Sequence, residues 1–150
     1  MERSYILHMF TPGKQMSPFD INMAVDAGYQ VVVPYCGVSL DEIGGLTQDA
    51  IFSRGPKGVK ATGIFIGGRD VMLAADMLDA ARKAMVPPFE VSVIADPSGS
   101  YTTAAALVAC VEQLLYTWDE AKLEDTRHVP AQPGAETPPA PWLERLLAET

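Results

Sequence analysis

The sequence predicts a single three-layer α/β domain with a mostly parallel sheet of about four strands and crossover helices, followed by a Pro-rich C-terminal tail. Two observations lead to this fold class. Short apolar runs alternate along the chain with segments of helical period, which is typical of strands joined by crossover helices. A chain of 150 residues, 48% of them hydrophobic, can bury enough surface for one core rather than two. We expect the domain to span residues 1–118 and the tail to span residues 119–150.

Four segments are predicted to be strands: Tyr5–Phe10, Val31–Pro34, Ala61–Ile66 and Glu90–Ala95. The last two are rich in residues that suit a buried strand.

Helices fit between and after these strands. Phe19–Ala27 is moderately amphipathic, and Ser39–Glu42 resembles a capping box that opens a short helix, which Gly44–Gly45 would interrupt. Asp70 precedes a longer amphipathic segment, Val71–Ala84, and is the expected N-cap of that helix.

Ser100 is the expected cap of a final long helix, Tyr101–Trp118, whose Ala- and Leu-rich composition predicts burial over much of its surface. After Trp118 the chain becomes acidic and rich in proline, which breaks long elements. At its end, Trp142–Leu147 places leucines on one helical side, and we expect a short helix that docks on the domain or on a partner.

Composition narrows the classes of function. The net charge of -8 opposes non-specific attraction to nucleic acid or to anionic lipid. The two cysteines, Cys36 and Cys110, lie far apart in apolar stretches, so we expect buried reduced thiols. No secretory signal or membrane-spanning run is recognised, which favours the cytoplasm. His8 and His128 have no motif around them, so no metal site or Ser-His-Asp triad is expected.

In open α/β sheets, ligands bind where loops leave the carboxyl ends of the strands. Gly67–Asp70 follows the third predicted strand, and its glycines allow backbone to approach a ligand closely, although the spacing is not GxGxxG. Asp70 itself is better explained as a helix cap. Nearby cations Arg54, Lys57 and Arg69 are candidate anion contacts in a protein that is acidic elsewhere.

The segment that follows the fourth predicted strand, Asp96–Ala106, combines a carboxylate with several hydroxyl groups at the start of a helix. One interpretation is a ligand site, because a carboxylate can accept two parallel N–H bonds from an aminopyrimidinone edge. The other is an ordinary Asx turn followed by a Ser cap. The residues leave these two interpretations equally open.

Six short motifs occur in an order that resembles a known family. They are Ser17–Asp20, Asp26–Gly28, Tyr35–Val38, Phe52–Gly55, Gly63–Asp70 and Asp96–Ala106. Together they resemble the N-terminal domain of NAD(P)-dependent methylene-tetrahydromethanopterin dehydrogenases of C1-metabolising bacteria. The resemblance implies an α/β domain that forms one wall of a cleft for a tetrahydromethanopterin or tetrahydrofolate derivative. The residues that it implies as contacts of the carrier are Asp20, Asp96, Ser98, Gly99, Ser100, Thr102 and Thr103.

In that family a second, Rossmann-type domain holds the nicotinamide. Here Asp119–Lys122 and the Pro-rich tail stand where the family continues into a strand and GxGxxG. Because hydride transfer requires two rings held face to face, we expect no NAD(P) site in this chain and no dehydrogenase activity from it alone.

Two classes of function follow. The chain is a binder of the one-carbon carrier, acting as a homo-oligomer or as a subunit completed by a nucleotide-binding partner, or it is an interaction or regulatory module that has lost the pocket.

Overall fold

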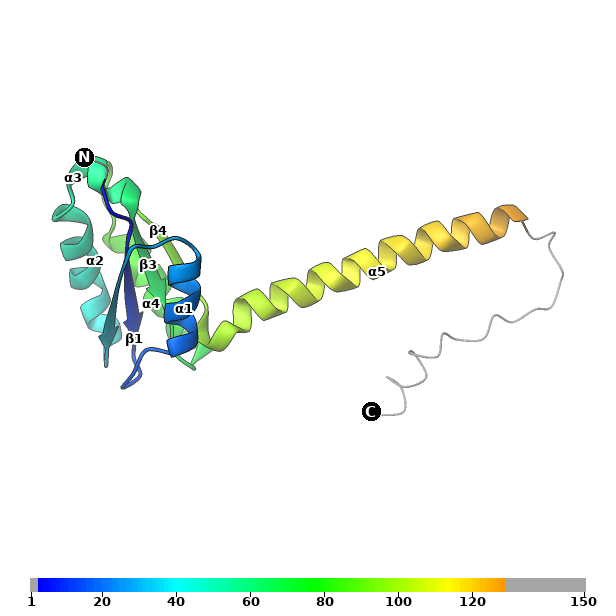
Figure 1. Ribbon diagram of the computed structural model, residues 1–150. Helices are drawn as coiled ribbons and strands as arrows, with labels where there is room; N and C mark the ends of the chain where they lie inside the picture. Colours follow the sequence, from blue (N-terminus) through cyan, green and yellow to red (C-terminus); the bar gives the residue numbers. More distant parts are fainter. Residues whose placement is uncertain (1–2, 129–150) are drawn as a thin grey trace. The chain divides into compact units, whose positions relative to one another are not determined.

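The computed structural model describes residues 3–128, with side chains for residues 3–118, and divides into one unit that ends at Val108 and another that begins at Ala109. The first unit contains a four-stranded sheet in the order β2-β1-β3-β4, in which every pair of neighbouring strands is parallel. Helices α1 and α2 lie on opposite sides of this sheet (Figure 1). The predicted three-layer α/β architecture is therefore confirmed.

The strands agree with the predicted segments, with shifted ends. They are β1 (Ile6–Thr11), β2 (Val31–Cys36), β3 (Thr62–Ile66) and β4 (Ser92–Ala95). The prediction ended the second strand at Pro34, but β2 continues to Cys36. Proline is tolerated there because β2 is an edge strand that pairs only with β1.

The helices are α1 (Pro18–Asp26), α2 (Ile43–Phe52), α3 (Gly55–Gly58), α4 (Val71–Ala84) and α5 (Ser100–His128), with short 3-10 turns at Leu40–Glu42, Val59–Ala61 and Pro97–Gly99. The capping box is confirmed, since the Ser39 backbone N–H donates to the Glu42 carboxylate over 2.8 Å. The expected interruption at Gly44–Gly45 is wrong. Helix α2 passes through both glycines, and a Cβ on Gly44 would lie only 4.0 Å from the Ala84 Cβ of α4. Packing between the two helices outweighs the poor helix propensity of glycine.

The core has two parts because side chains alternate along each strand. On one face of the sheet, Leu7 and Met9 of β1 pack with Met16 and with Ala24 of α1. On the other face, a larger cluster joins the sheet to α2 and α4; its buried members are Phe10, Val38, Ile43, Ile64, Ile66, Ala74, Met77, Ala81 and Ala95.

Three expectations of burial are wrong. Cys36 and Cys110 are both exposed free cysteines, Cys36 because it ends the edge strand β2 and Cys110 because it lies on α5. Every side chain of α5 from Tyr101 to Trp118 is exposed, including Leu107 at 64% and Leu114 at 67%. An Ala- and Leu-rich composition predicts burial, but it does not say which surface, in this chain or another, covers the helix.

In the second unit, α5 continues to His128, beyond its predicted end at Trp118. Segment 119–128 contains good helix formers and no proline, which explains the extension. The predicted terminal helix, Trp142–Leu147, lies outside the described residues. Among the described helices, none is long and apolar enough to cross a membrane.

Candidate functional site

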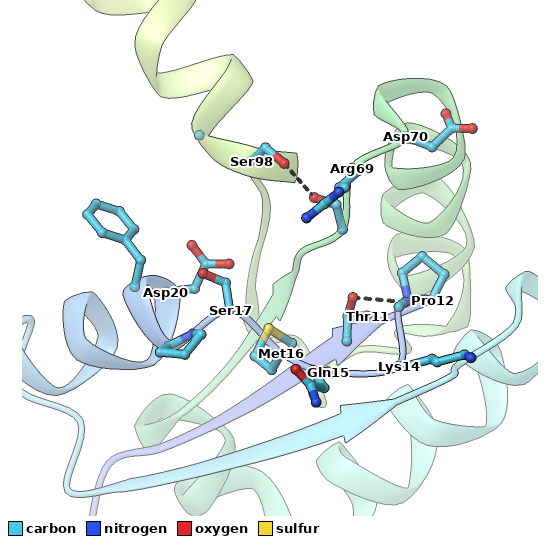
Figure 2. Close-up of a pocket in the computed structure, with 15 residues that line it drawn as sticks. Thr11, Pro12, Lys14, Gln15, Met16, Ser17, Asp20, Arg69, Asp70 and Ser98 are labelled. Atoms are coloured by element: carbon cyan, nitrogen blue, oxygen red, sulfur yellow. Dashed lines mark hydrogen bonds between the residues drawn. The ribbon is translucent and has the colours of Figure 1, made fainter.

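An open pocket of about 1000 Å³ lies at the carboxyl ends of β1, β3 and β4 (Figure 2). Three loops line it: Thr11–Asp20, which follows β1 and includes the start of α1; Gly68–Asp70, which follows β3; and Ser98–Gly99, which follows β4. The strand order places β1 beside β3, with β2 on one side of this pair and β4 on the other. The pocket therefore opens at the topological switch point, where open parallel sheets bind their ligands.

Backbone hydrogen bonds hold the loop after β1 in place. The buried Thr11 hydroxyl accepts from the Gly13 N–H over 3.1 Å. The Gly13 and Thr11 carbonyls accept from the N–H groups of Gly37 and Val38, at 2.7 and 3.0 Å. The backbone of this loop is therefore held against the segment that follows β2, and this fixes where the side chains of the loop begin.

Two glycines after β3 allow the pocket walls to approach one another. A Cβ on Gly67 would lie 3.4 Å from the Met16 sulfur and 3.5 Å from Asp20 Oδ2, so the Asp20 carboxylate lies close to this backbone. Gly68 has φ +125°, and a Cβ there would lie 3.2 Å from Pro12 Cδ. A side chain at Gly68 would be both strained and crowded.

The loop after β4 is joined to the loop after β3. The Ser98 hydroxyl donates to the Gly68 carbonyl over 3.1 Å (Figure 2). Ser98 has φ 53° and ψ 29°, a left-handed conformation that is uncommon outside glycine, asparagine and aspartate. Such strain is maintained only when its surroundings fix it, and here the hydroxyl contact with Gly68 helps to do so.

Asp96 acts as a helix cap in this structure. Its Oδ1 accepts from the backbone N–H groups of Tyr101 and Thr102, at 2.9 and 3.2 Å, and its Oδ2 accepts from the Thr102 hydroxyl at 2.6 Å. The expected Ser100 cap is wrong, because the Ser100 hydroxyl donates back to the Pro97 carbonyl. The expected Asp70 cap is confirmed: Asp70 accepts from two N–H groups of α4.

Asp20 is the carboxylate that faces the pocket without a described hydrogen-bond partner. It lies in the first turn of α1 and is partly buried. Burial, reinforced by the negative charge of Asp96, raises the pKa of the Asp20 carboxyl above its ordinary value. A ligand that donates N–H bonds to Asp20 would stabilise the ionised carboxylate and so offset both causes of this shift.

The structure brings together some of the predicted site residues and separates others. Asp20, Ser98, Gly99 and Arg69 line the pocket. Asp96, Ser100, Thr102 and Thr103 lie beside it, at the start of α5, but do not line it.

Two predicted anion contacts lie elsewhere. Arg54 donates to the Thr62 hydroxyl and to the Ser4 carbonyl, so it lies at the amino ends of β1 and β3, away from the pocket. Lys57 belongs to α3, which follows Arg54 directly. Proximity in sequence to the glycine-rich loop was a poor guide to proximity in the fold.

Sequence reasoning missed the first part of the loop after β1, although Asp20 at its end was an expected carrier contact. Thr11, Gly13, Lys14, Gln15 and Ser17 all line the pocket. The available signal was the position of this loop after a strand, with Pro12 and Gly13 marking a turn. No group of His, Cys, Asp and Glu side chains in the described part of the chain could hold a metal ion.

Comparison with known proteins assigns the family. The family model for "Methylene-tetrahydromethanopterin dehydrogenase, N-terminal" matches residues 18–98. The chain belongs to this family. The matched segment of this N-terminal-domain family runs from the start of α1 to Ser98 and so includes Asp20, the loop after β3 and Ser98, but not Lys14.

Two proteins of Methylorubrum extorquens (strain AM1) are similar to this chain. The NAD(P)-dependent methylenetetrahydromethanopterin dehydrogenase is 59% identical over 115 residues, which cover 77% of this chain and 38% of that protein. The bifunctional protein MdtA is 36% identical over 106 residues, or 71% of this chain and 37% of that protein. The chain thus spans little more than a third of the length of these relatives.

Proposed function

We propose that the pocket binds the reduced pterin ring of a one-carbon carrier, a tetrahydromethanopterin or tetrahydrofolate derivative. The observation that carries the proposal is the Asp20 carboxylate, which lines the pocket, has no described hydrogen-bond partner and has a raised pKa. An ionised carboxylate can accept two parallel N–H bonds from an aminopyrimidinone edge, and such charge-assisted bonds are strong. The family match supports a ligand of this class.

The rest of the pocket suits a flat heterocycle. Met16 and Phe19 provide apolar surface next to Asp20, and Phe19 is 68% exposed, so its ring is accessible. Aromatic side chains stack well on flat rings, while a few placed polar groups fix orientation in most small-molecule sites. Ser17 and Gln15 supply further polar groups along the same loop.

This proposal changes the role of Asp96. Both of its oxygens are occupied by the first turn of α5, so Asp20 is the better candidate for the ring. Asp96 acts on Asp20 through its negative charge, which contributes to the raised pKa of the Asp20 carboxyl.

A binding titration tests the proposal. Fluorescence or calorimetric titration with methylene-tetrahydromethanopterin and with tetrahydrofolate should give saturable binding. Asp20→Asn should weaken it roughly tenfold or more, because it removes a charged hydrogen-bond acceptor. Asp26→Asn is the matched control, since it makes the same change at the exposed other end of α1 and should leave affinity unchanged. Absence of saturable binding, or equal affinities of the two variants, would reject the proposal.

We further propose that hydride transfer requires a separate nucleotide-binding surface that holds a nicotinamide against the carrier, because that reaction depends on two rings held face to face. NADP reduction by this chain alone, followed at the nicotinamide absorbance band, should stay at background. Steady turnover by the isolated chain would contradict this second proposal and leave carrier binding intact.

The exposed apolar side chains of α5 favour a second candidate function, an interaction module. Leu107, Val108, Val111, Leu114 and Leu115 are all exposed, and exposed apolar surfaces of this kind mark protein contacts. A Leu114→Glu variant that keeps carrier binding but loses association with itself or with a partner would support this function. Unchanged association would argue against it.

A further inference from the structure

The pocket carries opposite charges on its two sides. The Asp20 carboxylate lies on one side, the Lys14 ammonium group lies on the other, and Arg69 extends from the loop after β3 between them (Figure 2). Lys14 and Arg69 come from different loops, which follow two neighbouring strands. A ligand that extends across this pocket from Asp20 therefore meets Arg69 first and Lys14 at the far end, with Asp70 next to Arg69 in the lining.

In the part of the chain that the structure describes, neither Lys14 nor Arg69 makes a contact that would give its side chain a structural role. No hydrogen bond or ion pair of Lys14 or Arg69 is found among the described residues, and both side chains are exposed. Arg54 differs, because its guanidinium is bound to the Thr62 hydroxyl and the Ser4 carbonyl. Asp70, the neighbour of Arg69, uses its Oδ1 to cap α4.

The size of the pocket leaves room for more than one ring. Its volume, about 1000 Å³, is at the upper end of the range typical of small-molecule sites. Other exposed cations, such as Lys57, also have no described partner, but Lys14 and Arg69 are the two that line the pocket, in a chain whose net charge is -8. Together these features indicate a ligand that extends from Asp20 to the cations and carries negative charge at that end.

We propose that Lys14 and Arg69 form an anion subsite for the tail of the ligand whose ring lies at Asp20. The subsite takes carboxylate or phosphate, which arginine binds with two parallel bonds and lysine binds as a point charge. This inference rests on the proposed pterin site, and it distinguishes carriers by their tails. Carriers with more negative tails should bind more tightly.

The test compares ligands that share a ring and differ in the tail: 6-methyltetrahydropterin, which has no anionic tail, tetrahydrofolate with one glutamate, and tetrahydrofolate with three glutamates. Affinity should rise along this series. Lys14→Ala and Arg69→Gln should each weaken the two tailed ligands roughly two- to fivefold, the range expected for exposed charge pairs. Binding of 6-methyltetrahydropterin should not change in either variant.

Lys57→Ala is the matched control, because it removes an exposed lysine of α3 that lies outside the pocket. It should leave every affinity unchanged. Raising the salt concentration should weaken the tailed ligands more than 6-methyltetrahydropterin, since salt screens exposed charges. Competition by glutamate identifies a carboxylate subsite, and competition by inorganic phosphate alone identifies a phosphate subsite; either result supports the proposal.

The outcomes separate this inference from the function on which it rests. If Asp20→Asn weakens all three ligands while Lys14→Ala and Arg69→Gln change nothing, the anion subsite is wrong and the ring site stands. If 6-methyltetrahydropterin does not bind and Asp20→Asn has no effect on the tailed ligands, the ring site is wrong. If Lys14→Ala and Arg69→Gln still weakened binding of the tailed ligands in that case, the anion subsite would bind them without a ring site at Asp20.

Discussion

Removal of the Asp96 carboxylate is expected to destabilise the fold rather than to remove a ligand contact. Asp96→Ala leaves the N–H groups of Tyr101 and Thr102 without their acceptor and leaves the Thr102 hydroxyl only its longer bond to the Gly99 carbonyl, at 3.3 Å. Truncation of a capping residue costs about 0.5–2 kcal/mol, and bonds to charged acceptors lie at the upper end of such ranges. We therefore expect the free energy of unfolding to fall by about 1–2 kcal/mol.

Urea titration followed by circular dichroism measures this change. For a domain of this size, about 1 kcal/mol corresponds to a shift in Tm of about 4–8 °C, so the Tm should fall by roughly 4–16 °C. Asp96→Asn and Asp96→Ser retain an oxygen acceptor and should lose less, because all three residues are good caps. Thr103→Val is the surface control, since Thr103 is exposed on the same turn of α5, and it should leave stability unchanged.

The same variant separates the two interpretations of the Asp96 segment. Under conditions in which the protein stays folded, Asp96→Ala should change carrier affinity far less than Asp20→Asn does. An unchanged free energy of unfolding, combined with a large loss of affinity, would refute the capping role and restore Asp96 as the carboxylate that binds the ring.

Three further predictions follow from the described geometry. Gly68→Ala should cost about 1–3 kcal/mol in urea unfolding, because its φ of +125° strains any side chain; unchanged stability would contradict this. Met77→Ala should cost about 2–5 kcal/mol, because Met77 is fully buried, whereas Met77→Leu should cost less than about 1.5 kcal/mol; equal losses would argue against tight packing there. Because folding raises the pKa of Asp20 above 3.8, its contribution to stability is greatest below that pH and is lost as pH rises through the folded pKa. Asp20→Asn should therefore be more stable than the unchanged protein at neutral pH, with the difference shrinking in acid; a difference independent of pH would contradict the sign.

The elements that sequence predicted well are those set by local chemistry. Short apolar runs identified the four strands, and segments of helical period identified the main helices. Short sequence motifs predicted the Ser39–Glu42 capping box and the Asp70 cap, because each depends only on hydrogen bonds between neighbouring residues. The structure contains both. The rule that ligands bind at the carboxyl ends of parallel strands pointed to Gly67–Asp70 and to the Asp96 segment, and the pocket includes part of each.

The failures arise where the answer depends on partners distant in the chain. Lys14 was missed because its loop reaches the pocket only through the pairing of β1 with β3. Arg54 was assigned to an anion site, although tertiary contacts with Ser4 and Thr62 hold it at the other end of the sheet. Composition predicted a buried α5, but it contains no information on which surface would cover that helix, and Leu114 is exposed.

The strand order explains why the pocket carries opposite charges on its two sides. From β1 the chain passes through α1 to β2 on one side, and from β3 it passes through α4 to β4 on the other. Since connections of this kind are right-handed, the two helices must lie on opposite faces of the sheet, so the chain turns to opposite sides after β1 and β3 and leaves a gap, which narrows where Gly67 and Gly68 approach Asp20 and Pro12. Asp20 enters this gap from the start of α1 and Arg69 from the loop before α4. The two charges thus enter the pocket from connections that lead to opposite faces of the sheet, and the ligand that we propose is one long enough to contact both.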